Sequence, residues 1–472
     1  MAKNWPTAMS KRQVSHFLPT MPLPPALSPT ANVRRSCRML MKEPVVDPFL
    51  DEPSDLISTR PNVDDTHTKT SSPQQAPTAH RTVGIYSTSL TKLAVKIASQ
   101  ISADDESSSA SPEAIEWDAD GWHYTGAKYA RSTSRADSYG CGCSEHEDQV
   151  EVQRVERVLL YILALDTINF CFWPTEDSSG KSVCAKNLLE YEHLASALRL
   201  TAEKDDVIAE DDVGAESADT YAFSPRNLAK TSLESFLSDI QKYLPEPTSD
   251  GGDGCYLIPN ASERVRLLNE LGHGLITHHD GSATAMLKKC IGPSGRPSAV
   301  KLVDIITSTF RGFRDEVVDA KGRQICFYKR AQIVVGDIWA AFAKGKTDTV
   351  GGRLTNFDDI SELTTFADYR VPQLLRHVGV LRYSEELSTK VDGMEELMAG
   401  SSDELFIRAG TVVAVDRLVD EVKQTLKDNV ASQGRIDKVN AVLLDWHLWQ
   451  IGEKMDREGT LKPHHRVRTI FY

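Results

Sequence analysis

Cysteines are few in this sequence, and a surplus of basic residues and long apolar runs are missing from it. Its 472 residues include only eight cysteines, and no two of them stand at the Cys-x-x-Cys spacing of many zinc sites. Cys141 and Cys143 are too close together to form such a pair. We therefore expect reduced, intracellular cysteines and no bound metal.

The charge balance is acidic, with a formal net charge of −13. Binding to nucleic-acid phosphates needs clustered Lys and Arg, so this balance argues against direct nucleic-acid binding, and equally against a membrane surface. The longest apolar run, from Val158 to Leu165, is about half of the roughly 18–20 residues that a helix needs to span a bilayer. We expect a soluble protein.

Several signatures of nucleotide and hydrolase chemistry are also absent. The chain has no G-x-x-x-x-G-K-[ST], no G-x-G-x-x-G after a predicted strand, no G-x-S-x-G and no H-E-x-x-H. These absences argue against P-loop nucleotide hydrolysis, dinucleotide redox chemistry, common serine hydrolysis and zincin proteolysis. No cofactor is expected.

Composition changes near residue 82. Residues 1–82 are rich in Pro, Ser and Thr without a persistent apolar period, and we predict that they are disordered. The first 42 residues carry basic but no acidic side chains, which is compatible with a transit peptide, although a solvated tail is the favoured explanation. Polar segments at 102–112, 202–218 and 245–254 are predicted to be loop insertions.

Residues 83–472 have the apolar period of helices. Apolar side chains recur at spacings of three and four from Val152 to Leu163, and similar stripes continue along the chain. Alternating strand patterns are short and rare, the best being 114–117 and 324–328. We predict a mainly α fold with one large helical domain over 83–472.

Polar residues inside aromatic stretches are the candidates for function. Lys329 adjoins an aromatic pair in "FYKRAQ", Asp368 lies in "TTFADYRVPQ" and Asp445 in "LLDWHLW". Each motif alone is more often core packing. A buried carboxylate, however, must be paired, hydrogen-bonded or used, so several such motifs in one helical domain favour a pocket.

These motifs, in this order, resemble those of the queuosine salvage protein family, the queuosine 5′-phosphate N-glycosylase/hydrolases. The resemblance includes "ALDTINFCFWP" and the terminal "PHHRVRTIFY" and covers roughly residues 110–472. It implies a helical fold similar to DNA glycosylases. It also implies cleavage of queuosine 5′-monophosphate into queuine and ribose 5-phosphate, which recovers queuine for tRNA modification.

Under this resemblance Asp368, the aspartate of the Phe-Ala-Asp-Tyr-Arg motif, is the candidate catalytic residue. Breaking an N-glycosidic bond builds positive charge on the ribose, which a fixed carboxylate beneath the anomeric carbon stabilises. Its action as nucleophile, base or electrostatic stabiliser is left open. Pro372 suits the first turn of a following helix, which would hold Asp368 on a rigid bend.

The resemblance also implies the residues that bind the base. Phe366 would stack on the deazaguanine ring, and Asp445 with Trp446 matches the family's base-binding pair. The family commonly has another acidic residue where this chain has Gln450. Glutamine can hydrogen-bond the diol of the base's amino-cyclopentenediol arm, but it cannot neutralise the arm's ammonium.

Basic residues are candidates for the 5′-phosphate. Lys329 at a predicted helix start is the first choice, either for the phosphate or for an ion pair with Asp368, and Arg330 and Arg370 are further possibilities. His146 falls near a ligand-contacting histidine of the family. Asp315 matches a family motif too, and we expect a structural role for it.

Two other functions stay open. An N-ribohydrolase for a different nucleoside or nucleotide would share Asp368 but not the base pocket, whereas a non-catalytic helical ligand-binding module would leave Asp368 dispensable. We expect a small-molecule substrate and a cytoplasmic location, with the mitochondrion and the nucleus as alternatives. The sequence does not indicate the oligomeric state.

Overall fold

The structure is a computed structural model that describes residues 28–41, 82–102, 144–173, 187–211, 221–245, 256–342, 349–428, 436 and 439–472. Over these residues the chain is mainly α-helical, which confirms the predicted fold class. The helices pack around one large apolar core. Among the helices that the structure describes, none combines the length and the apolar character needed to cross a membrane.

Helices supply nearly all of the regular structure. The longer ones are α2 (Ser87–Ser102), α5 (Ser144–Thr167), α6 (Tyr191–Asp211), α8 (Leu233–Tyr243), α9 (Ala261–His278), α11 (Ala299–Thr309), α12 (Lys329–Phe342), α16 (Ser402–Lys427) and α17 (Ala441–Arg457). The shorter ones are α7 (Pro225–Leu228), α10 (Ala283–Lys288), α13 (Val350–Thr355), α14 (Arg370–His377) and α15 (Glu385–Asp392), with 3-10 turns at Arg311–Phe313 and Ile360–Glu362.

The strands that the structure describes form three two-stranded pairs. Antiparallel pairs join β1 (Val83–Ile85) to β4 (Leu381–Tyr383) and β2 (Glu316–Val318) to β3 (Gln324–Cys326), and a parallel pair joins β5 (Glu396–Leu397) to β6 (Arg466–Val467). The strand predicted at 324–328 is confirmed for its first three residues. The strand predicted at 114–117 lies outside the described residues.

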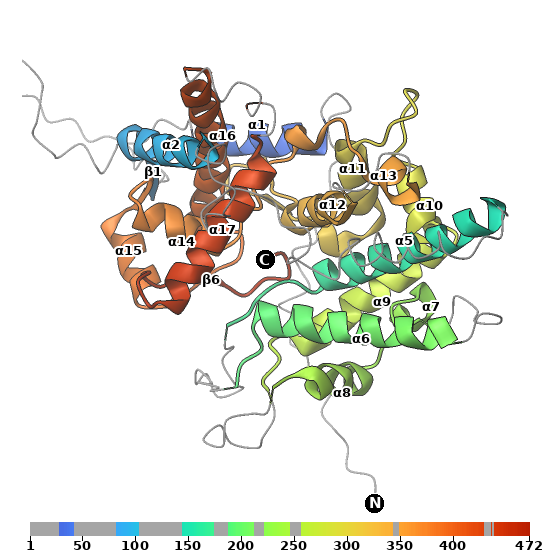
Figure 1. Ribbon diagram of the computed structural model, residues 1–472. Helices are drawn as coiled ribbons and strands as arrows, with labels where there is room; N and C mark the ends of the chain where they lie inside the picture. The colour runs from blue at the N-terminus through green and yellow to red at the C-terminus, as the bar shows by residue number, and fades with distance from the viewer. Residues whose placement is uncertain are drawn as a thin grey trace, which may run out of the picture.

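Two groups of helices face each other across α12 (Figure 1). On one side lie α14, α16 and α17, and on the other lie α5, α6 and α9. Helix α12 packs against α5, and α14 packs against both α16 and α17. The start of α17 is fixed by Asn440, whose side chain accepts the Leu443 N–H at 3.0 Å, an N-cap that satisfies a donor left over at the helix end. The space between the groups is where the motifs of the sequence meet.

An additional helix, α1 (Pro29–Met41), lies inside the stretch predicted to be disordered, so that prediction is wrong for these residues. Val33 and Cys37 are fully buried, and α1 packs against α16, β3 and α11. The composition of residues 1–82 as a whole did not reveal the short apolar stripe that α1 buries. The rest of 1–82, apart from residues 28 and 82, lies outside the described residues.

Helix α1 also holds two segments that lead into the site. The Ser36 hydroxyl accepts the Cys326 N–H at 3.1 Å, and the Arg34 guanidinium donates to the Leu363 carbonyl at 2.9 Å. The same guanidinium pairs with Asp416 on α16 at 3.2 Å. One helix from the N-terminal part of the chain therefore braces the residues just before Lys329 and the residues just before Asp368.

The acidic segment at 202–218 was predicted to be a loop, which is wrong for its first half. Helix α6 continues to Asp211, because Ala202 is fully buried and anchors that part of the helix on the core. The remainder of this segment, and nearly all of 102–112 and 245–254, lies outside the described residues. Cys141 and Cys143 also lie outside them.

Candidate active site

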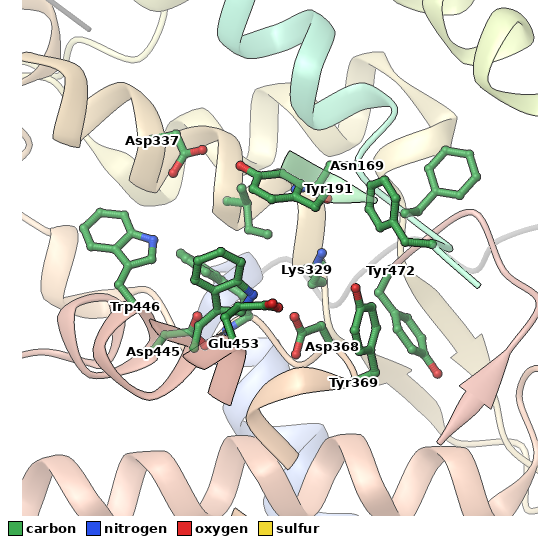
Figure 2. Close-up of a pocket in the computed structure, with 15 residues that line it drawn as sticks. Asn169, Tyr191, Lys329, Asp337, Asp368, Tyr369, Asp445, Trp446, Glu453 and Tyr472 are labelled. Carbon is green, nitrogen blue, oxygen red and sulfur yellow. Dashed lines mark hydrogen bonds between the residues drawn. The ribbon is translucent and has the colours of Figure 1, made fainter. Parts of the chain in front are cut away.

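A pocket lies where the end of α5, the start of α12, the segment before α14 and one face of α17 meet (Figure 2). Four carboxylates and one basic side chain line it. The carboxylates are Asp337, Asp368, Asp445 and Glu453, and the basic residue is Lys329. Aromatic rings complete the wall, namely Phe170, Phe172, Tyr191, Phe366, Tyr369, Trp446, Trp449 and Tyr472.

Asp368 is held rigidly at the start of α14. One carboxylate oxygen accepts the N–H groups of Arg370 at 2.9 Å and Val371 at 3.2 Å, which caps the helix and exposes the carboxylate to its positive end. Pro372 lies in the first helical turn, as predicted. Burial raises the pKa of Asp368, and the nearby Lys329 ammonium is the strongest influence in the opposite direction.

Lys329 is the first residue of α12, as predicted, and its side chain is buried in the pocket beside Asp368. Burial lowers its pKa, and the charge of Asp368 is the largest opposing effect. Each group thus favours the charged form of the other. Among the described residues no carboxylate lies within the 4.0 Å of an ion pair from the Lys329 ammonium, so this cation is available to a ligand.

Asp445 lies on α17 with its carboxylate against the Thr364–Phe366 segment. One oxygen accepts the Thr365 hydroxyl and also the Phe366 N–H at 2.8 Å. Burial is the main reason that the pKa of Asp445 is raised to about 8, and the charge of Asp368 contributes to the same shift. The two carboxylates are therefore coupled, and the hydrogen-bond donors hold Asp445 in place.

The raised pKa of Asp445 predicts a pH-dependent stability. Such a carboxyl binds its proton more tightly when folded, so its contribution is fully present below the unfolded pKa, near 3.8, and is lost as the pH rises through about 8. Between these two pH values we expect the free energy of unfolding of the wild type to fall relative to that of Asp445→Asn. Above about pH 8 the difference between the two proteins should stay constant. Urea unfolding of both proteins, from about pH 5 to about pH 9, measures this difference. Parallel curves throughout would contradict the assignment.

A cluster of aromatic rings lies next to Asp445. The rings of Trp446 and Trp339 are stacked, with centroids 6.1 Å apart, and Phe366 is tilted against Trp446 at 6.5 Å. Gly336 makes room for this group, because a Cβ there would meet Phe366 at 3.0 Å and Trp446 at 3.4 Å. Phe366, Asp445 and Trp446 thus come together, as the resemblance implied.

Gln450 does not belong to this pocket. Its side chain is exposed, whereas Asp445, Trp446, Trp449 and Glu453 line the cavity. Steps of four and eight residues from Asp445 turn by only about 40° and about 80° around the helix, and the step to Trp446 turns by about 100°, whereas a step of five turns by about 140°, away from the cavity. The acidic side chain that α17 supplies is Glu453, which the sequence analysis did not single out.

Two other predicted basic residues, Arg330 and Arg370, are placed differently from Lys329. Arg330 donates to the carbonyls of Asp166, Thr167 and Gly312, so it braces the turn after α5. Arg370 pairs with Glu453 at 2.7 Å rather than lining the cavity. His146 falls in the first turns of α5, where side chains lie outside the described residues, and its role stays a prediction.

Behind the pocket lies a clamp that the sequence analysis missed, made by Arg408 of α16. Its guanidinium donates to both oxygens of Asp315, at 3.0 and 2.5 Å, and to the Ala367 carbonyl at 3.0 Å. Asp315 in turn accepts the backbone N–H of Lys329 at 3.2 Å. Asp315 therefore has the structural role expected of it. The Arg408–Asp315 clamp holds the backbone next to Asp368 and the backbone of Lys329 in fixed positions relative to each other.

The left-handed backbone of Tyr328, with φ of 49°, directs the chain into α12. This conformation is unfavourable for a bulky residue and persists only where its surroundings hold it. Here the Tyr328 N–H donates to the Asp315 carbonyl at 3.2 Å and its hydroxyl donates to Glu316 at 2.8 Å. The turn delivers Lys329 to the pocket floor, facing the Asp368 loop.

Other residues that line the pocket were also not predicted. Asp337 lies on α12, the same helix as Lys329, and Tyr191 lies at the start of α6. Within the described residues, no group of three His, Cys, Asp or Glu side chains is arranged to hold a metal ion. The site thus consists of carboxylates, one lysine and aromatic rings, which suits a flat, polar organic ligand.

Comparison with known proteins gives a consistent result. A family model described as queuosine salvage protein matches residues 149–472. A protein of Dictyostelium discoideum named queuosine 5′-phosphate N-glycosylase/hydrolase is 37% identical over 337 residues, which cover 71% of this chain and 85% of that protein. Proteins with the same name from Sphaerobacter thermophilus and Mus musculus are 37% and 34% identical over 318 and 319 residues, each covering 67% of this chain and 82% of the relative.

Proposed function

The chain belongs to the queuosine salvage protein family, and on this premise we propose that it hydrolyses the N-glycosidic bond of queuosine 5′-monophosphate. The products are queuine and ribose 5-phosphate, and the released queuine serves tRNA modification. The observation that carries the proposal is the meeting of Asp368, Lys329 and the Asp445–Trp446 pair in one buried pocket. The chain is thus an N-glycosyl hydrolase.

The reaction needs charge stabilisation at the ribose. As the bond from C1′ to the base nitrogen breaks, its electron pair leaves with the base and positive charge develops on the ribose. A water oxygen then bonds to C1′, one of its protons passes to the base nitrogen, and the other stays in the new hydroxyl group. The capped and immobile Asp368 carboxylate supplies negative charge for this transition state without having to reorient.

Base recognition follows from the way Asp445 is held. One of its oxygens is occupied by Thr365 and Phe366, so the other oxygen is left for the N1–H and the exocyclic amine of the deazaguanine. Phe366 and Trp446, which line the pocket beside it, supply aromatic faces for stacking. Stacking of a base on an aromatic side chain contributes about 1–3 kcal/mol.

The direct experiment is incubation of the full-length protein with queuosine 5′-monophosphate, with chromatographic detection of released queuine. Release at a rate proportional to protein concentration supports the proposal. No release from folded protein, as judged by circular dichroism, would instead point to a different N-ribohydrolase or a non-catalytic binding protein. Guanosine 5′-monophosphate is the matched substrate control, because it lacks the 7-substituent and carries nitrogen at position 7.

Substituting Lys329 with Met tests the proposed phosphate contact. A hydrogen bond to a charged group contributes about 1.5–3 kcal/mol, so we expect KM for the nucleotide to rise about 10- to 100-fold. The nucleoside queuosine, which has no phosphate, should lose much less. Steady-state kinetics with both substrates measures the difference, and equal losses would instead show that Lys329 acts through its charge on Asp368 and not on the phosphate.

Three further expectations stay predictions. They are the similarity of the fold to DNA glycosylases, a single domain over 83–472 preceded by a separate extension, and a cytoplasmic location. The mainly helical architecture, with a pocket between two groups of helices, supports the first. The acidic net charge of −13 supports a small-molecule substrate rather than tRNA itself.

A further inference from the structure

The proposed hydrolysis needs a group that takes a proton from water. Water is a weak nucleophile, and a side chain that removes its proton while the new bond to C1′ forms accelerates such a step about 10²- to 10⁴-fold. Most glycoside hydrolases divide the work between two carboxylates that flank the bond to be broken. The structure places a second carboxylate beside Asp368, namely that of Glu453.

Glu453 lies on the face of α17 that lines the pocket, and Figure 2 shows its carboxylate close to that of Asp368. Burial is the main reason that the pKa of Glu453 is raised, and the charge of Asp368 contributes to the same shift. The pKa of Tyr369 is likewise raised mainly by burial, and the charges of both carboxylates add to it. The two carboxylates are therefore near each other in the molecule and not only in the view of the figure.

Arg370 connects the two carboxylates. Its backbone N–H donates to Asp368 at 2.9 Å, and its Nε donates to Oε1 of Glu453 at 2.7 Å. The same guanidinium is paired with Asp456 at 2.9 Å. Gly452 lets the arginine stem lie against α17, because a Cβ at this glycine would meet the Cγ and Cδ of Arg370 at 3.0 Å. One residue thus sets the position of Glu453 relative to Asp368.

The contacts of Glu453 suit a proton acceptor. Arg370 occupies Oε1, which leaves Oε2 as the oxygen that faces a water molecule. The side chain is 19% exposed, so water reaches it. Arg370 is the strongest influence that opposes the raised pKa of Glu453, and Asp456 adds to the rise as Asp368 does. A carboxylate with a raised pKa is the stronger base.

Asp368 is less suited to the same task. One of its oxygens already accepts the N–H groups of Arg370 and Val371, and the ammonium of Lys329 lies nearby. These contacts favour the ionised form of Asp368, so they weaken it as a proton acceptor. They suit a carboxylate that keeps its charge throughout the reaction.

We propose that Glu453 is the general base of the hydrolysis and that Arg370 is the residue that positions it beside Asp368. This inference rests on the proposed function and extends it. As the water oxygen bonds to C1′, one water proton passes to Oε2 of Glu453, and the electron pair of the bond from C1′ to the base nitrogen leaves with the base. The proton then passes from Glu453 through water to the base nitrogen, which restores the carboxylate.

Glu453→Gln tests this role, because the amide oxygen can still accept the hydrogen bond from Arg370 but the amide cannot take the proton. We expect kcat for queuosine 5′-monophosphate to fall about 10²-fold or more, with KM nearly unchanged. Asp456→Asn is the matched control, since it neutralises the other carboxylate that pairs with Arg370. It should change kcat by about threefold or less.

Added azide gives a readout that a purely structural role would not change. Azide is an anionic nucleophile that needs no base, so it should accelerate the release of queuine by Glu453→Ala. The azide nitrogen bonds to C1′, the base leaves with the electron pair and takes a proton from water, and the second product is ribosyl azide 5-phosphate. Wild type and Asp456→Asn should show no acceleration.

A kcat of Glu453→Gln within about threefold of wild type would overturn the assignment, as would a failure of azide to accelerate Glu453→Ala. If neither variant folds, as judged by circular dichroism, single-turnover release by wild type in D2O decides. Slower release than in H2O supports transfer of a water proton in the chemical step, and equal rates refute it. Wild-type protein that releases no queuine would overturn the proposed function itself.

Discussion

Replacing Asp368 with Asn should lower kcat by about 10³-fold or more, because it removes the charge that faces the developing positive charge on the ribose. Substrate affinity should change little, since the base contacts and Lys329 stay in place. Single-turnover release of queuine measures the chemical step. Turnover within about tenfold of wild type would contradict a catalytic role for Asp368.

The fold should tolerate this substitution well. An asparagine oxygen can accept the N–H groups of Arg370 and Val371 as the carboxylate does, so the cap of α14 is kept. Burial raises the pKa of Asp368, which means that its charge is held at some cost to stability. We therefore expect the variant to unfold at the same temperature as wild type or higher, which separates loss of catalysis from loss of structure.

The largest expected effect on stability comes from Arg408→Met. The substitution leaves Asp315 as a buried charge without its bidentate partner, which typically costs about 3–5 kcal/mol. It also releases the Ala367 carbonyl, so the Asp368 loop is no longer fixed relative to Lys329. Urea unfolding should show the loss of stability, and kcat should fall with it.

A double variant provides the control for this prediction. Adding Asp315→Asn removes the stranded charge, so Arg408→Met with Asp315→Asn should regain part of the stability but not the activity. Equal stability of the single and the double variants would show that the clamp acts through packing of the arginine stem and not through charge. Arg408 also lies over the rings of Phe327 and Tyr472, which such packing would involve.

The sequence was informative where function depends on short motifs. Asp368, Lys329 and Asp445 were each predicted from aromatic surroundings, and the structure brings them together although they are far apart in the chain. Pro372 and the start of α12 followed from local helix rules. Such rules act over a few residues, so a single sequence exposes them.

Other features depend on contacts between distant segments. Arg408 lies on a helix that is buried along most of its length, and nothing near it in the sequence indicates that it reaches Asp315 and Ala367. Gln450 was chosen from the family's pattern, but the helical spacing from Asp445 could have excluded it in favour of Glu453. Asp337 lies on the same helix as Lys329, but nothing near it in the sequence indicates that it lines the pocket.

Helix α1 has a consequence for where the smallest folding unit of this chain begins. The family model starts at residue 149, yet Ser36 and Arg34 hold the segments that carry Lys329 and Asp368. A truncated protein starting at that boundary would also lose α2, and the apolar surface of α16 would be open to aggregation. We therefore expect the autonomous folding unit to include α1, upstream of the predicted boundary at residue 83, and we expect proteolytic removal of the N-terminal region to inactivate the protein.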